Sequence, residues 1–222
     1  MKLGIILEKI AKDPKYKKRL VAAKKGLDFE NNLFLEITDD GEYISYPNAT
    51  FKKHKNFQEI KKLINSGNEN TSFIRINLLD DILSTPKVIF QPFGKQSSPD
   101  FLFLRKGKAL ALECKFTEHN IKAPVWNSGL PKLHFNYIFG SLMLEDITFF
   151  SGNGLLDQQE SNSIIKLVAV KREELKEEGL KITNKFEIYL RPMYNQKENS
   201  WKSTNRNNYE GKVIKAVKEF EK

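Results

Sequence analysis

The clearest alternation of apolar and polar positions lies on both sides of Gly107. Two apolar runs of strand length, residues 101–104 and 109–114, flank this glycine and its polar neighbours. The pattern predicts a β-hairpin with a two-residue turn that ends at Gly107. In that register Asp100 stands directly opposite Glu113, and directly opposed side chains share one face of a sheet.

One face of this hairpin collects charged side chains. Side chains alternate along a strand, so Glu113 and Lys115 lie on the face of Asp100, while Cys114 points to the opposite face. Neighbouring carboxylates repel each other, and a divalent cation is a common way to neutralise them. The pattern predicts a metal site, with Mg²⁺ as the ion because the side-chain donors are oxygens. The alternative is an exposed hairpin with ordinary surface charges.

Similar patterns predict the remaining elements. Apolar residues at helical spacing predict helices over residues 1–11, 27–37, 51–64, 156–178 and 207–222, and apolar runs predict strands over residues 73–76, 87–90, 137–140, 146–150 and 186–190. Asp13 before Pro14 is a helix-start signal, and Gly179 predicts a helix end. The order predicts a single α/β (α+β) domain over residues 1–222, with a central mixed sheet of about four to six strands flanked by helices. Residues 38–86 could form a small inserted lobe.

A second carboxylate of interest lies in a predicted helix. Glu30 falls within the apolar stripe formed by Leu27, Leu33, Phe34 and Ile37. A carboxylate on a buried face is costly unless it is paired or bound to a metal. Glu30 is therefore either an auxiliary acid of the metal site or a residue at the margin of the stripe that reaches water.

Composition narrows the class of protein. The 222 residues include 37 Lys and Arg against 28 Asp and Glu, a net charge of +9 that suits a polyanionic partner. Cys114 is the single cysteine, which excludes an intramolecular disulfide and favours a reducing, cytoplasmic compartment. No apolar run approaches the roughly 20 residues that a membrane helix needs. The three histidines lack metal-ligand spacing, and no phosphate-binding glycine loop is present.

The spacing of the charged residues also resembles a known family. Pro99-Asp100 followed by Glu113-x-Lys115 resembles the PD-(D/E)XK nuclease superfamily, and residues 91–100 with the later Asn127-Ser128 look most like type II restriction endonucleases. The resemblance implies a restriction-endonuclease-like fold, catalytic Asp100, Glu113 and Lys115, and Mg²⁺ held by Asp100, Glu113 and the backbone carbonyl of Cys114. Glu30, in a Gly-x-x-Phe-Glu pattern, would lean towards the same ion.

Candidate DNA contacts come from polar loops near these motifs. They are Gln96, Asn127, Ser128, Lys132 and Arg206, whose side chains can donate to phosphates or bases. Each of these segments could instead be a plain connecting loop. The resemblance implies double-stranded DNA as substrate, a homodimer that reads palindromic sites, and a cognate DNA methyltransferase in the same prokaryotic host.

The sequence therefore predicts a Mg²⁺-dependent, site-specific DNA endonuclease. Two alternatives keep the same fold. One is a repair or junction-resolving nuclease, which selects DNA by shape. The other is a DNA-binding module without catalytic activity.

Overall fold

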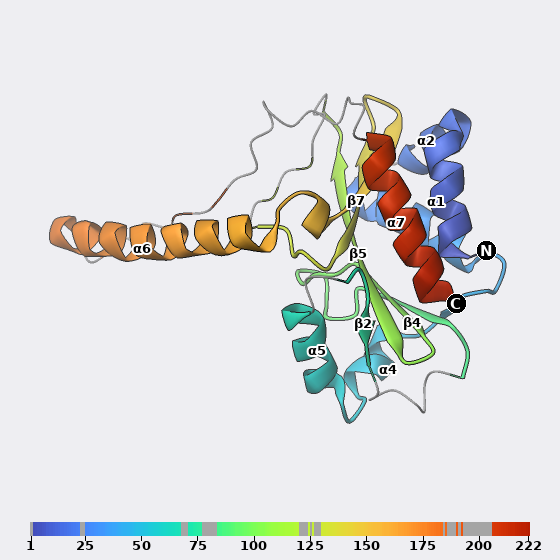
Figure 1. Cartoon of the computed structure of the whole chain (residues 1–222), viewed down its shortest axis with the longest axis horizontal. Coiled ribbons are helices and arrows are strands. Elements are labelled where there is room, and N and C mark those ends of the chain that lie inside the picture. The colour runs from blue at the N-terminus through green and yellow to red at the C-terminus, as the bar shows by residue number, and fades with distance from the viewer. Residues whose placement is uncertain are drawn as a thin grey trace.

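The computed structural model describes residues 2–22, 25–67, 71–76, 84–119, 124, 126, 130–183, 185, 190, 192 and 206–222. In this part of the chain a mixed sheet lies between two sets of helices (Figure 1). Its strands are β1 (Ile44–Ser45), β2 (Ile74–Arg75), β3 (Lys87–Phe90), β4 (Phe101–Arg105), β5 (Lys108–Thr117), β6 (Asn136–Ser141) and β7 (Asp146–Ser151). The predicted mixed sheet with flanking helices is confirmed.

The strands lie in the order β1-β3-β4-β5-β6-β7, and β2 pairs with the first half of β5. The pairs β1/β3 and β5/β6 are parallel, while the other neighbouring pairs are antiparallel. The sheet has seven described strands, one more than the upper end of the predicted range. The strand without a predicted counterpart is β1, whose two residues are too few to show a strand period, whereas β2 lies within the predicted strand over residues 73–76.

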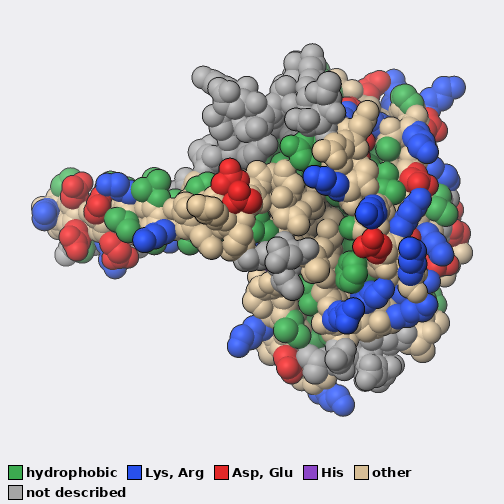
Figure 2. All heavy atoms as spheres, viewed as in Figure 1, with side chains coloured by type: hydrophobic (Ala, Val, Ile, Leu, Met, Phe, Trp, Pro, Cys, Tyr) green, Lys and Arg blue, Asp and Glu red, His purple; other side chains and the backbone are tan. Residues whose placement is uncertain are grey.

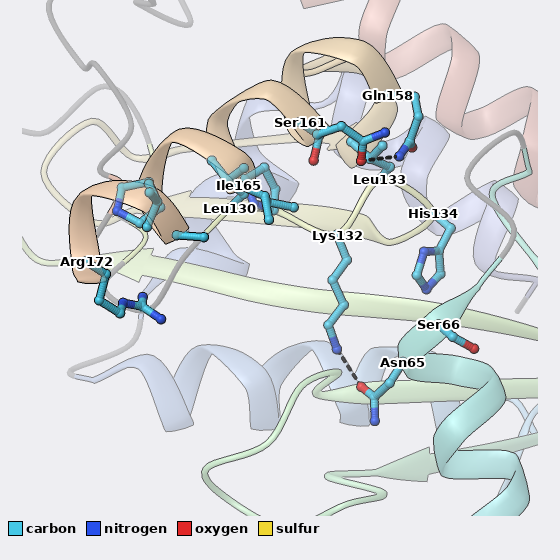
Figure 3. Close-up of a pocket in the computed structure, with 15 residues that line it drawn as sticks. Asn65, Ser66, Leu130, Lys132, Leu133, His134, Gln158, Ser161, Ile165 and Arg172 are labelled. Atoms are coloured by element: carbon cyan, nitrogen blue, oxygen red, sulfur yellow. Dashed lines mark hydrogen bonds between the residues drawn. The ribbon is translucent and has the colours of Figure 1, made fainter. Parts of the chain in front are cut away.

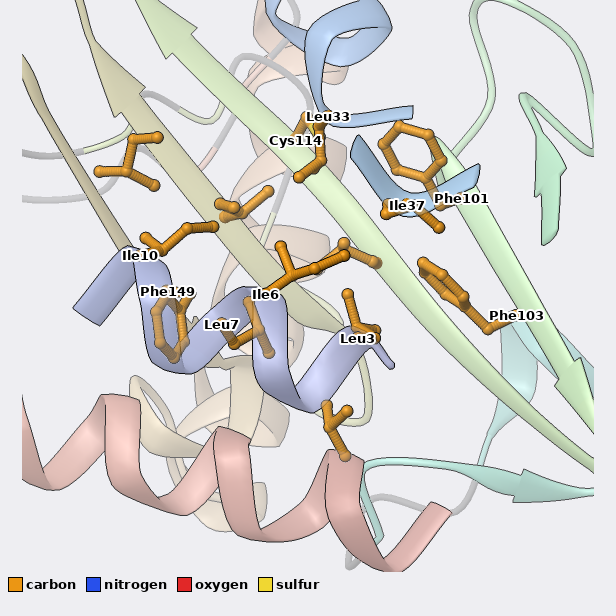
Figure 4. Packing of buried hydrophobic residues seen from close by; sticks show 14 of the residues in the cluster. Leu3, Ile6, Leu7, Ile10, Leu33, Ile37, Phe101, Phe103, Cys114 and Phe149 are labelled. Atoms are coloured by element: carbon orange, nitrogen blue, oxygen red, sulfur yellow. The ribbon is translucent and has the colours of Figure 1, made fainter. Parts of the chain in front are cut away.

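Four helices cover the first face of the sheet. They are α1 (Leu3–Lys12), α2 (Pro14–Val21), α3 (Gly26–Thr38) and α7 (Arg206–Glu221). The predicted start of α2 is confirmed, because the Asp13 carboxylate accepts hydrogen bonds from the backbone N–H groups of Lys15 and Tyr16. Figure 4 shows the core beneath these helices, in which Leu3 and Ile6 of α1 lie among side chains from the strands.

The second face carries α4 (Asn48–Lys52) and α5 (Phe57–Ser66). Phe51 and Ile60 of these helices pack in a second core with Leu102, Ala109 and Ala111 of the hairpin. The described part of residues 38–86 contributes β1 and β2 to the central sheet and Phe51 and Ile60 to the second core, and the possible inserted lobe stays a prediction.

The longest described helix projects from the sheet (Figure 1). This helix, α6 (Gln158–Ile182), follows the short turn η1 (Gly152–Gly154) and begins at a capping box between Asp157 and Glu160. The prediction that Gly179 ends it is wrong: the helix tolerates this glycine and ends at Ile182. The predicted strand over residues 186–190 lies outside the described residues except for Leu190. Within the described part of the chain, none of the helices is both long and apolar enough to span a membrane.

Candidate functional site

The site begins with the hairpin of β4 and β5. Lys106 and Gly107 have φ angles of 47° and 70°, the left-handed conformation that a two-residue hairpin turn of this kind requires. The strands pair outward from this turn to Phe101 opposite Leu112. The predicted register is confirmed, and it brings Asp100 next to the amide of the residue after Glu113.

Asp100 links three strands at the open end of the hairpin. Its carboxylate Oδ2 accepts a hydrogen bond of 2.7 Å from the backbone N–H of Cys114 on β5. Its backbone carbonyl accepts a bond of 2.7 Å from the N–H of Gln91, the residue after β3. Burial, and then the negative charges of Glu113 and Glu30, raise the pKa of Asp100 to about 8. Asp100 is therefore held in place in a position where its own negative charge is disfavoured.

Glu113 and Lys115 form the charged pair beside it. The Lys115 Nζ lies 2.7 Å from Oε1 of Glu113, and the two side chains are 24% and 13% exposed. The second carboxylate oxygen of Glu113, Oε2, is buried and has no hydrogen-bond partner. A buried carboxylate oxygen without a partner is costly, so this atom marks a position suited to a cation or a donor.

Glu30 reaches the same site from α3. Its Oε2 accepts a hydrogen bond of 3.2 Å from Nε2 of Gln91. Burial raises the pKa of Glu30, the bond from Gln91 opposes that effect, and the charge of Glu113 adds to it. We call Asp100, Glu113 and Glu30 together the acidic site. Of the two interpretations offered by the sequence, the structure favours the one in which Glu30 belongs to this site rather than to the margin of the apolar stripe.

Cys114 points away from the acidic site, as the strand alternation predicts. Its side chain lies in the first core near Leu33 of α3 (Figure 4). Burial raises the pKa of this thiol well above its ordinary value. The thiol is therefore a core group, and the role of the Cys114 carbonyl as a metal ligand stays a prediction.

The acidic site fits a hard divalent cation by its chemistry. Asp100, Glu113 and Glu30 offer carboxylate oxygens, and burial, followed by repulsion from neighbouring carboxylates, raises the pKa values of Asp100 and Glu30. In the described residues, however, no three His, Cys, Asp or Glu side chains already surround one point as metal ligands. The carboxylates therefore have to move closer together to share an ion.

Three neighbours of the site carry no signal in the sequence. Gln91 contacts Glu30, and Tyr137 of β6 stands beside Glu113 in the parallel pair. The Tyr137 hydroxyl accepts a bond of 2.8 Å from the backbone N–H of Lys132, and the Lys132 ammonium donates to Oδ1 of Asn65. The β3/β4 and β5/β6 pairings bring Gln91 and Tyr137 to this region, and the end of α5 brings Asn65 to Lys132, so no local motif could reveal them.

The predicted DNA contacts have different outcomes. Gln96 is exposed in the loop before Asp100, and Asn127 and Ser128 lie outside the described residues. Lys132 lies close enough to the acidic site for Glu113 to raise its pKa, although burial lowers it overall.

Arg206 has partners within the fold. Its guanidinium bonds both carboxylate oxygens of Asp146 at 2.5 and 3.0 Å, and its Nε lies 2.9 Å from Oε1 of Glu210. It also donates to the Ile147 carbonyl. These bonds hold α7 against β7. Because they engage the guanidinium of Arg206 within the chain, they disfavour the predicted DNA contact.

Known proteins offer no further guide to this site. The chain matches no protein-family model, no curated protein and no solved structure. The mixed α/β sheet and the acidic site at the end of β4 and β5 are therefore the basis for assigning a function.

Proposed function

We propose that this chain is a Mg²⁺-dependent, site-specific endonuclease of double-stranded DNA, of the type II restriction class. One observation carries the proposal: Asp100, which accepts the N–H of Cys114, and Glu113 lie within electrostatic range at the end of a hairpin, with the Lys115 ammonium 2.7 Å from Glu113 and an unpartnered buried oxygen on the same carboxylate. The resemblance of Pro99-Asp100 and Glu113-x-Lys115 to nuclease motifs supports the same reading.

Each side chain has a distinct role in this proposal. Asp100 and Glu113 hold the cation, and Glu30 adds a third carboxylate whose orientation Gln91 maintains. When bound, Mg²⁺ supplies an activated water and offsets negative charge on the scissile phosphate. Lys115 orients the attacking water and stabilises the charge that develops on the phosphate oxygens.

The proton on Asp100 connects cation binding to pH. With a pKa raised to about 8, Asp100 carries a proton at neutral pH when no cation is bound. A carboxylate that binds a cation must be ionised, so Asp100 releases its proton on binding. We therefore expect the affinity for Mg²⁺ to rise as the pH increases through about 8, where this group ionises.

The substrate and partners follow from charge and from the resemblance. The net charge of +9 favours a polyanion such as DNA. Recognition of a palindromic site would use a homodimer, and protection of the host genome would use a methyltransferase of matching specificity.

Plasmid cleavage tests the proposal. Purified protein with Mg²⁺ should convert supercoiled plasmid to discrete linear fragments, and Asp100→Ala should abolish the bands. Cutting of branched DNA without regard to sequence would instead identify a junction or repair nuclease. Tight DNA binding without cleavage under any divalent cation would identify a binding module. Unchanged cutting by Asp100→Ala would contradict the assigned site.

A further inference from the structure

A cavity lies beside the acidic site, on the side of the sheet from which α6 projects. Its volume is about 430 Å³, and it is bounded by the first half of α6, the end of α5 and residues 130–134 (Figure 3). Pockets that bind small molecules usually have volumes of roughly 300–1,000 Å³. The cavity is therefore large enough for a ligand of the size of one nucleotide.

The walls of this cavity combine apolar surface with one polar atom that lacks a partner. Leu130, Leu133 and Ile165 provide apolar surface. Gln158 donates from Nε2 to Oδ1 of Asn162 at 2.8 Å, while its own Oε1 is buried and without a hydrogen-bond partner. An unsatisfied buried carbonyl oxygen favours a ligand that brings an N–H donor.

The charges of the lining favour an anion. Lys132 and Arg172 line the cavity, and no Asp or Glu is among its described lining residues. A ligand with flat apolar faces, N–H donors at its edge and an attached phosphate satisfies all of these features. A nucleotide has this combination, since every nucleobase has a π-face and an edge that can donate.

Lys132 connects the cavity to the acidic site. Its side chain lines the cavity, and its backbone N–H donates to the hydroxyl of Tyr137, which stands beside Glu113 in the sheet. Burial lowers the pKa of Lys132 and the charge of Glu113 raises it, so the cavity lining and the acidic site lie within electrostatic range of each other.

We propose that this cavity receives one nucleobase of the substrate strand, taken out of the base stack. The Gln158 carbonyl accepts a hydrogen bond from the edge of the base, the apolar residues contact its faces, and Lys132 and Arg172 offset the charge of adjacent phosphates. The link to cleavage depends on the proposed nuclease function, whereas binding of a nucleotide in the cavity does not.

Calorimetric titration of the intact chain with deoxynucleoside monophosphates, without a divalent cation, tests this assignment. At least one of dAMP, dCMP, dGMP and TMP should bind, and deoxyribose 5-phosphate, which lacks the base, should bind about tenfold more weakly. Gln158→Ala should weaken binding of the nucleotide by a similar factor. Gln159→Ala, at the next position of α6 and outside the cavity, is the matched control and should leave binding unchanged.

Two further variants keep the test independent of folding and of the acidic site. Ala169→Phe, at an exposed lining position, should block the nucleotide by filling the cavity. Asp100→Asn should bind the nucleotide like the original chain. Equal binding of the baseless phosphate, an unchanged affinity in Gln158→Ala, or loss of binding in Asp100→Asn would each overturn the assignment. Plasmid cleavage without nucleotide binding would overturn the base-binding role of the cavity and support the nuclease proposal. Nucleotide binding without cleavage would support the base-binding role and contradict the nuclease proposal.

Discussion

At the scale of single residues, the acidic site holds carboxyl groups whose ionised form the fold disfavours. Asp100 is fixed by the N–H of Cys114 and Glu30 by the amide of Gln91, yet burial and mutual repulsion raise both pKa values. Glu113 uses one oxygen for Lys115 and leaves the other without a partner. Such arrangements cluster at functional sites, because stability is given up there for a group that binds something else.

The pH dependence of stability follows from Asp100. Its pKa is about 8 in the folded chain against 3.8 as the ordinary value, so between these limits the folded state binds a proton that the unfolded state has lost. Stability therefore falls as pH rises from about 4 to about 8. Asp100→Asn removes this loss and should raise the melting temperature at pH 8.5, in EDTA, by about 3 °C or more.

Asp39→Asn, at an exposed carboxylate after α3, is the control for that measurement. Its melting temperature should equal that of the original chain across the whole pH range. Parallel pH profiles of the melting temperature for Asp100→Asn and the original chain would show that Asp100 is not the group that titrates.

A role of Lys115 in cleavage can be distinguished from ordinary ion pairing by comparing it with a second ion-paired lysine. Lys115→Ala should reduce plasmid cleavage by about 100-fold or more, because it removes the group that orients the water and offsets charge. Lys171 on α6 also lies 2.7 Å from a glutamate, Glu174, but both side chains are about half exposed. Lys171→Ala should therefore cleave at the original rate, and an equal loss in both variants would refute a specific role for Lys115.

At the scale of elements, local signals and long-range pairing account for different parts of the site. The turn at Gly107 and the two apolar runs determine the register, so the placement of Asp100 and Glu113 at the same end of the hairpin could be predicted from the sequence. Gln91 and Tyr137 could not, since they reach the site only through the β3/β4 and β5/β6 pairings. The same limit applies to Arg206, whose acidic partner Asp146 lies 60 positions earlier in the chain.

Two glycines test how tightly these elements pack. A Cβ on Gly152 would lie 2.0 Å from the backbone carbonyl oxygen of Lys132, whereas a Cβ on Gly211 of α7 would meet nothing within 4 Å. Gly152→Ala must displace the segment that borders the cavity and should lower the melting temperature by about 5 °C or more. Gly211→Ala should raise it by about 2 °C, because alanine favours a helix interior. Thermal unfolding of both variants measures these shifts. A Gly152→Ala variant as stable as the original chain would contradict this packing.

At the scale of the whole molecule, positive charge on the face in view is mixed with negative charge (Figure 2). Figure 2 shows Lys and Arg side chains over the face formed by α1 and α7, with Asp and Glu among them. On the neighbouring α2, Lys17, Lys18 and Arg19 each form an ion pair within the chain. These basic residues of α2 therefore have acidic partners within the chain that offset part of their charge.

DNA affinity should nevertheless depend strongly on salt. With a net charge of +9, binding to duplex DNA releases counterions, and the affinity should fall by about 10³-fold between about 50 and 200 mM salt. A titration by fluorescence anisotropy across this range measures the slope. An affinity independent of salt would contradict a binding surface that contacts the phosphate backbone.

The central claim is that the Glu113 carboxylate is a cation ligand, and calorimetric titration with Mg²⁺ at pH 8 tests it most directly. The original chain should bind Mg²⁺, and Glu113→Gln should lose that binding. Glu174→Gln, which removes the carboxylate of an exposed Lys–Glu pair with the same 2.7 Å distance, should bind like the original chain. Equal binding of Mg²⁺ by the original chain and Glu113→Gln, or no binding by the original chain, would contradict the account.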